Sequence, residues 1–174
     1  MWPSTLKVHT LRPVHAHAIG LHLLALNADD RYNRFGVAIS DAALRDWVQR
    51  LDWRVQPWWG IWGGSDMGLL AVLQLSKTRQ SAVYELAMSV HPLVRCEGLG
   101  TRLLTTVIQQ SPEVRKLICH HGHVAVRKMI HRMGWTCQTF TGEGWWEFQD
   151  EHATEPRCRA ANPTSASPSV SAHV

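Results

Sequence analysis

One strand–turn–helix unit in the middle of the chain constrains the fold more than any other feature. Residues 81–90 form an apolar run that predicts a β-strand, and the strand stops at the proline at position 92. The turn at residues 95–100 then reads Arg-x-x-Gly-x-Gly, and apolar side chains at helical spacing predict a helix that runs to residue 110. A strand that enters a helix through such a turn indicates a layered domain in which helices cover a sheet.

This glycine-rich turn also predicts a chemistry. Glycines let successive backbone N–H groups converge on one point, and the positive end of the new helix adds to their field, so the turn suits a pyrophosphate. A glycine-rich turn that binds nothing explains the motif about equally well. A Walker loop is excluded because the chain has no Gly-Lys pair, and Leu103 stands where a dinucleotide fingerprint needs its third glycine. Met67 likewise replaces the last glycine of a G-x-S-x-G nucleophile elbow.

The rest of the chain alternates between strand and helix patterns. The expected order is β-α-α-β-β-β-α-β-α-β-β, which indicates an α/β (α+β) protein with a central mixed sheet flanked by helices. Besides the unit above, helices are expected at residues 14–26, after a cap at Ser40, and at 124–133. Further strands are expected at residues 6–11, 58–62, 69–75, 116–119, 136–140 and 145–148.

Composition sets the organisation and excludes several classes. The 174 residues suggest one domain over residues 1–150, and residues 151–174, rich in Ala, Ser, Pro and Thr, are expected to form a disordered tail. A net charge of +4 without clustered Lys and Arg argues against a nucleic-acid partner. No apolar run approaches the length of a membrane span, so no membrane partner is expected. Four isolated cysteines favour a reducing cytoplasm.

Two segments resemble the GNAT superfamily of N-acyltransferases. Residues 85–104 resemble its signature, a strand followed by Arg/Gln-x-x-Gly-x-Gly/Ala and a helix, and residues 123–135, HVAVRKMIHRMGW, resemble its second motif. Residues 30–36, DRYNRFG, are similar to a stretch in uncharacterised bacterial members. The likeness extends over about residues 5–148 and implies the GNAT acyl-CoA N-acyltransferase fold. It also implies that acetyl-CoA donates an acetyl group to a primary amine by direct attack in a ternary complex.

The resemblance assigns roles to particular residues. The fourth strand would hydrogen-bond the pantetheine and the thioester carbonyl through the backbone of Met88, Ser89 and Val90. The pyrophosphate would lie on the backbone amides of the turn and the helix start, which include Arg95, Cys96, Gly98, Leu99, Gly100 and Thr101. The side chains of Arg95 and Arg102 are candidate phosphate contacts, and His123 takes the place of an asparagine that holds the pantetheine arm. Glu85 is the candidate general base, with an ion-pair or sheet-edge role as the alternative.

Some residues depart from the family pattern. Ile130 stands where many members have a tyrosine that protonates the departing thiolate, so that acid is unassigned and water is an alternative. Cys96 replaces a glycine, Glu97 replaces a basic residue, and His123 replaces an asparagine. These changes favour the alternative of a catalytically weak or inactive acyl-CoA-binding module.

Histidines and tryptophans are the remaining candidates. Residues 119–123, CHHGH, lack the spacing of a zinc motif, and we expect no metal site. Strand alternation places Trp58 and Trp62 on one face and Trp59 on the other. Core packing is the first reading of these side chains, a homodimer interface the second and the wall of an acceptor pocket the third.

Overall fold

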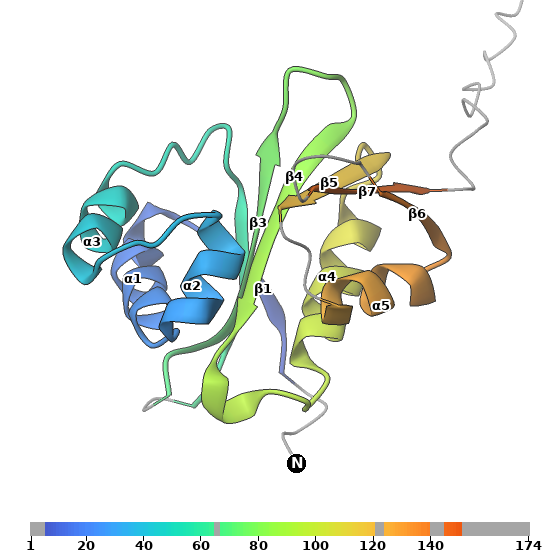
Figure 1. Ribbon diagram of the computed structural model, residues 1–174. Helices are drawn as coiled ribbons and strands as arrows, with labels where there is room; N and C mark the ends of the chain where they lie inside the picture. Colours follow the sequence, from blue (N-terminus) through green and yellow to red (C-terminus); the bar gives the residue numbers. More distant parts are fainter. Residues whose placement is uncertain (1–5, 65–66, 121–123, 140–144, 151–174) are drawn as a thin grey trace, which may run out of the picture.

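The computed structural model describes residues 6–64, 67–120, 124–139 and 145–150. Within them, seven strands form one mixed sheet in the order β1-β2-β3-β4-β5-β7-β6 (Figure 1). The strands are β1 (Val8–Leu11), β2 (Trp58–Trp62), β3 (Leu69–Lys77), β4 (Val83–Val90), β5 (Lys116–His120), β6 (Trp135–Thr139) and β7 (Trp145–Asp150). The expected fold class, with a central mixed sheet flanked by helices, is confirmed.

Helices cover both faces of this sheet. One face carries α1 (Ala16–Leu24), α2 (Ala28–Phe35) and α3 (Asp41–Gln49), and the other carries α4 (Leu99–Gln110) and α5 (Val124–Arg132) (Figure 1). Short 3-10 turns, Pro13–His15 and Pro92–Val94, precede α1 and α4. No helix in the described part of the chain combines the length and apolar character needed to cross a bilayer.

Strand pairing creates a division in the middle of the sheet. All neighbouring strands run antiparallel except β4 and β5, which are parallel and are connected through α4. β4 stays paired with β3 through residue 90, yet it pairs with β5 only along residues 83–85, opposite 116–118. Within the described residues, the β5-facing edge of β4 therefore carries no ladder partner from residue 86 onward.

A hydrophobic core lies on each side of the sheet. The core under α4 and α5 includes Leu103, Leu117 and Phe148, all fully buried, and the core under α1 to α3 includes Leu23 and Trp58. Trp62 packs against the second core and Trp59 against the first, as strand alternation predicts. No tryptophan of the described residues is among the exposed large apolar side chains, which favours the core reading.

Helix α2 was missing from the sequence-based expectation. The Asn27 side chain caps it by accepting a 2.8 Å hydrogen bond from the Asp30 N–H, and Gly36 ends it at a φ of 71°. None of its residues is fully buried, so it carries no apolar stripe of the kind that periodicity detects. The expected tail at residues 151–174 lies outside the described residues.

Candidate active site

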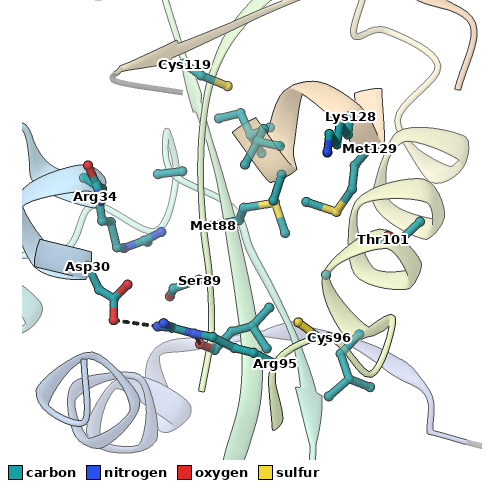
Figure 2. A pocket seen from close by; sticks show the side chains of 18 of the residues that line it. Asp30, Arg34, Met88, Ser89, Arg95, Cys96, Thr101, Cys119, Lys128 and Met129 are labelled. Atoms are coloured by element: carbon teal, nitrogen blue, oxygen red, sulfur yellow. Dashed lines mark hydrogen bonds and ion pairs between the residues drawn. The ribbon is translucent and has the colours of Figure 1, made fainter. Parts of the chain in front are cut away.

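A cavity of about 520 Å³ lies where β4 separates from β5, a volume typical of small-molecule sites (Figure 2). Its walls come from α2, β4, the start of α4 and α5. The lining side chains include Asp30, Asn33 and Arg34 of α2, residues 85–90 of β4, residues 98–101 at the start of α4, and Lys128, Met129 and Arg132 of α5.

Almost all of the residues assigned from the resemblance lie around this cavity. They are Glu85, Met88, Ser89, Val90, Arg95, Cys96, Gly98, Leu99, Gly100 and Thr101. Arg102 is not among the lining residues, and His123 lies outside the described residues. The α2 residues and the two basic residues of α5 are additions that the sequence reasoning missed.

Strand β4 supplies side chains on both faces of the sheet, toward the α2 half of the cavity and toward its α4–α5 half. Met88 and Val90 pack with the core under α4 and α5, whereas Ser89 contacts His22 of α1 on the opposite face. Between these faces, the backbone of residues 86–90 forms the part of the β4 edge that does not pair with β5. Unpaired backbone N–H and C=O groups on such an edge are available to an extended ligand.

Two glycines determine the conformation and the packing of the start of α4. Gly98 has a φ of 78°, a left-handed conformation that favours glycine. Gly100 lies so close to β4 that a Cβ there would approach both Met88 Cε and Val90 Cγ2 to 3.3 Å. No side chain caps this helix start and its first turn holds no acidic residue, so its free N–H groups remain available to an anion.

Helix α5 brings positive charge to the same wall. Lys128 and Arg132 are one helical turn apart and both line the cavity. Ile130, between them in sequence, is fully buried in the core and does not line the cavity. The two tyrosines of the chain, Tyr32 and Tyr84, do not line it either, so no phenol replaces the missing family tyrosine there.

Glu85 lies half-buried on the cavity wall, at the last β4 position that pairs with β5. Burial raises the pKa of its carboxyl group, and the positive charge of Arg34 partly opposes this rise. A raised pKa brings a carboxylate closer to the range in which it can exchange protons near neutral pH. Cys119, also on the wall, is fully buried, and burial raises the pKa of its thiol so that it stays protonated.

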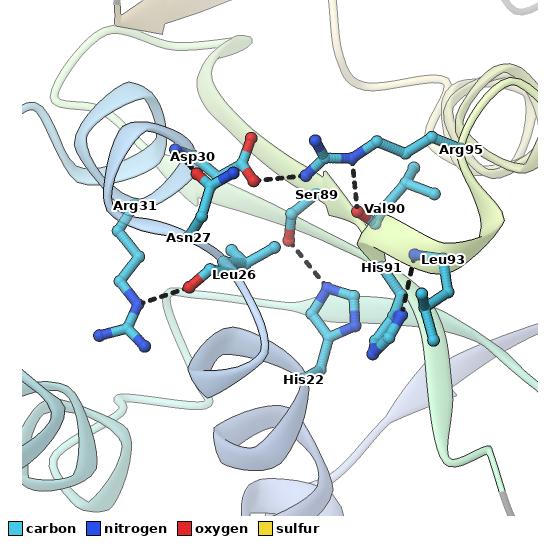
Figure 3. A network of polar contacts seen from close by, with 10 residues as sticks. All are labelled: His22, Leu26, Asn27, Asp30, Arg31, Ser89, Val90, His91, Leu93 and Arg95. Atoms are coloured by element: carbon cyan, nitrogen blue, oxygen red, sulfur yellow. Dashed lines mark hydrogen bonds and ion pairs between the residues drawn. The ribbon is translucent and has the colours of Figure 1, made fainter.

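The side chain of Arg95 turns away from the start of α4. Its Nη2 atom lies 2.5 Å from Asp30 Oδ2, and its Nε donates a 3.4 Å hydrogen bond to the Val90 carbonyl (Figure 3). Arg95 therefore ties α2 to the end of β4, and in this arrangement its guanidinium is paired with a protein carboxylate.

A buried histidine holds the hydroxyl of Ser89. His22 Nδ1 lies 2.8 Å from the Leu69 carbonyl and must donate to it, so Nε2 accepts from Ser89 Oγ at 3.0 Å (Figure 3). Burial lowers the pKa of His22 to about 4, and Arg34 and His91 add to this effect. The imidazole is neutral near pH 7, and the lone pairs of the Ser89 oxygen remain available at the cavity wall.

Comparison with known proteins agrees with the sequence resemblance. Residues 22–135, more than half of the chain, match the model of the Acetyltransferase (GNAT) family. Similar solved structures include the GNAT domain of S. lividans PAT, with 12% identity, a TM-score of 0.63, and coverage of 85% of this chain and 98% of that chain. Ribosomal-protein-S5-alanine acetyltransferase from Vibrio fischeri has 9% identity, a TM-score of 0.64 and coverage of 90% and 98%.

A third similar structure, a phosphinothricin acetyltransferase from Sinorhizobium meliloti in complex with AcCoA, has 14% identity, a TM-score of 0.61 and coverage of 91% and 96%. At these identities the structures demonstrate a shared fold. No curated protein sequence matches the chain significantly. The matched family model and the shared fold lead to one conclusion: this chain belongs to the GNAT family of acetyltransferases.

Proposed function

We propose that this protein transfers the acetyl group of acetyl-CoA to a primary amine by direct attack within a ternary complex. The observation that carries the proposal is the cavity at the β4–β5 division, which joins an unpaired strand edge, an uncapped helix start and a half-buried carboxylate. Each of these parts suits one portion of the two substrates.

The residues of the cavity fit the donor. The N–H groups at the start of α4 suit the pyrophosphate, and Lys128 and Arg132 supply the positive charge that Arg95, paired with Asp30, does not. The backbone of Met88, Ser89 and Val90 suits the amide groups of an extended pantetheine arm, which would add to the free edge of β4. These assignments place the donor on the α4–α5 half of the cavity.

The acceptor would then enter from the α2 half, where Glu85 lies. Glu85 takes a proton from the amine, directly or through water, and burial makes it a stronger base because it raises the pKa of the carboxyl group. Bound acetyl-CoA supplies the activated acyl group. A thiol has a pKa of about 8.5, so the leaving thiolate can take its proton from water without a phenol on the wall.

The test combines binding with turnover. Titration calorimetry is expected to give a micromolar Kd for acetyl-CoA, equivalent to about −8 kcal/mol, and thiol release is then measured across a panel of amines. Glu85→Gln is expected to lower kcat by about 10²–10⁴-fold while the Kd for acetyl-CoA stays unchanged. Glu113→Gln, an exposed glutamate away from the cavity, is the matched control. No binding of acetyl-CoA up to millimolar concentration refutes the proposal.

A further inference from the structure

We propose that the acceptor is a free amino acid, whose carboxylate binds Arg34 while its amine faces Glu85. This inference rests on the proposed function and adds the substrate class. It starts from Arg34, a residue of α2 that lines the cavity and extends from its helix toward β4 (Figure 2).

Arg34 carries hydrogen-bond donors that nothing in the described structure satisfies. Its Nε and Nη1 atoms are buried without a partner, and the only other such atom among the described side chains is Nε1 of Trp58. The Arg34 guanidinium lies 5.2 Å from the centre of the Trp58 ring, and Trp58 itself is fully buried and does not line the cavity. The unsatisfied Arg34 atoms are N–H donors of a residue that lines the cavity, and they lack an acceptor such as a carboxylate oxygen.

The guanidinium is held in this position. It lies over the rings of Trp58 and Phe35, at 5.2 and 5.6 Å, and its Nη2 donates to Gln74 Oε1 at 3.3 Å. Gln74 is itself buried and donates to Ser76 Oγ at 3.2 Å, which keeps its carbonyl oxygen turned toward Arg34. A guanidinium fixed between aromatic rings and a buried amide is organised in advance for a planar anion.

No carboxylate of the described residues forms an ion pair with Arg34. Asp30, one turn earlier on α2, is paired with Arg95. Glu85 is near enough for its charge to raise the pKa of Arg34, yet burial lowers that pKa overall to about 10. A buried charge without a direct partner is unfavourable, and a ligand carboxylate removes that cost.

The two charges on the α2 half of the cavity also select the acceptor. Arg34 and Glu85 present one positive and one negative group, and a zwitterionic amino acid carries the complementary pair. An amine without a carboxylate would approach Glu85 beside an unpaired guanidinium, which repels an ammonium ion. The pocket therefore favours amines that bring their own anion.

The experiment measures thiol release from acetyl-CoA with the twenty L-amino acids, and with the amide and the decarboxylated amine of each active one. We expect at least one amino acid to be acetylated with a kcat/KM at least tenfold above that of both derivatives. In Arg34→Gln the KM for that amino acid is expected to rise by about 10–100-fold, the effect of losing a charge-assisted hydrogen bond, with no such rise for the decarboxylated amine. Arg34→Lys, which keeps the charge without the planar fork, is expected to recover part of the loss.

Arg50→Gln is the matched control, because Arg50 is exposed and its side chain pairs with Asp46 on α3, away from the cavity. Calorimetric binding of acetyl-CoA by each variant shows that it is folded, and the substrate comparison with the unmodified protein does not depend on any variant. Equal turnover of amino acids and decarboxylated amines overturns this inference and leaves the proposed function standing. Turnover of an amine from the panel above but of no amino acid also overturns this inference alone. Thiol release with neither the amino acids nor the panel of amines, by protein that binds acetyl-CoA, refutes the proposed function and this inference with it.

Discussion

Mild acid is expected to destabilise this fold through one side chain, His22. Its imidazole is buried under the sheet, and desolvation lowers its pKa from 6.5 to about 4. Above pH 6.5 the ring is neutral in both the folded and the unfolded chain. Below it, the unfolded chain binds a proton that the folded chain does not accept until about pH 4, so the free energy of unfolding falls as the pH drops.

The size of the effect follows from the difference between the two pKa values. Each pKa unit corresponds to about 1.4 kcal/mol, so the full interval from 6.5 to about 4 removes about 3 kcal/mol of stability. This is a large share of the roughly 5–15 kcal/mol that stabilises a typical domain.

Urea unfolding across this pH interval measures the loss. The unmodified protein is compared with His22→Gln, which has no titrating group at this position, and with His17→Gln, an exposed histidine on the same helix. Between pH 6.5 and 4 the unmodified protein and His17→Gln should lose about 3 kcal/mol more than His22→Gln. Identical pH profiles for all three proteins, or an NMR titration of His22 with a midpoint near 6.5, would refute the reasoning.

Three further changes test other parts of the structure. Cys96 has a φ of 64°, so Cys96→Gly is expected to raise the free energy of unfolding by up to about 1 kcal/mol in urea titrations, and a loss of stability would contradict this. Leu117 is fully buried, and Leu117→Ala should cost about 2–5 kcal/mol in the same assay; a cost below 1 kcal/mol would count against the packing described. Because Arg34 lowers the pKa of Glu85, Arg34→Gln should move the acidic limb of the kcat/KM profile to higher pH, and an unmoved limb would argue against Glu85 as the base.

Local patterns in the sequence predicted the elements that dominate the fold. The apolar spacing of α4 and the alternation of tryptophans on β2 both reflect burial. Burial of one face of an element produces a regular spacing of apolar residues, and this spacing is visible in the sequence. The glycine turn before α4 could also be predicted from the sequence. The positive φ at Gly98 and the close packing at Gly100 both favour a residue without a side chain.

The α2 side of the cavity could not be predicted from the sequence, for a physical reason. Helix α2 has no fully buried residue, so the helix itself was signalled only by the cap at Asn27 and the glycine at position 36. The likeness of residues 30–36 to family members indicated neither a helix nor a cavity wall. The position of the Arg34 guanidinium depends on its contact with the Trp58 ring. Arg34 and Trp58 are separated along the chain by α3 and a long loop, so the sequence does not show this contact. The turn of Arg95 toward Asp30 likewise depends on where α2 packs, which spacing around the glycine motif does not reveal.

The division of the sheet has a mechanical consequence. Strands β1 to β4 form one group and β5 to β7 another, and in the described part of the chain the backbone ladder between the two groups spans only residues 83–85 and 116–118. We expect so short a ladder to let the two groups of strands shift relative to each other, and a ligand bound along the free part of β4 to restrict that movement. Amide hydrogen exchange in residues 86–90 should therefore slow when a ligand is bound along β4. The two groups of strands should then unfold as one cooperative unit.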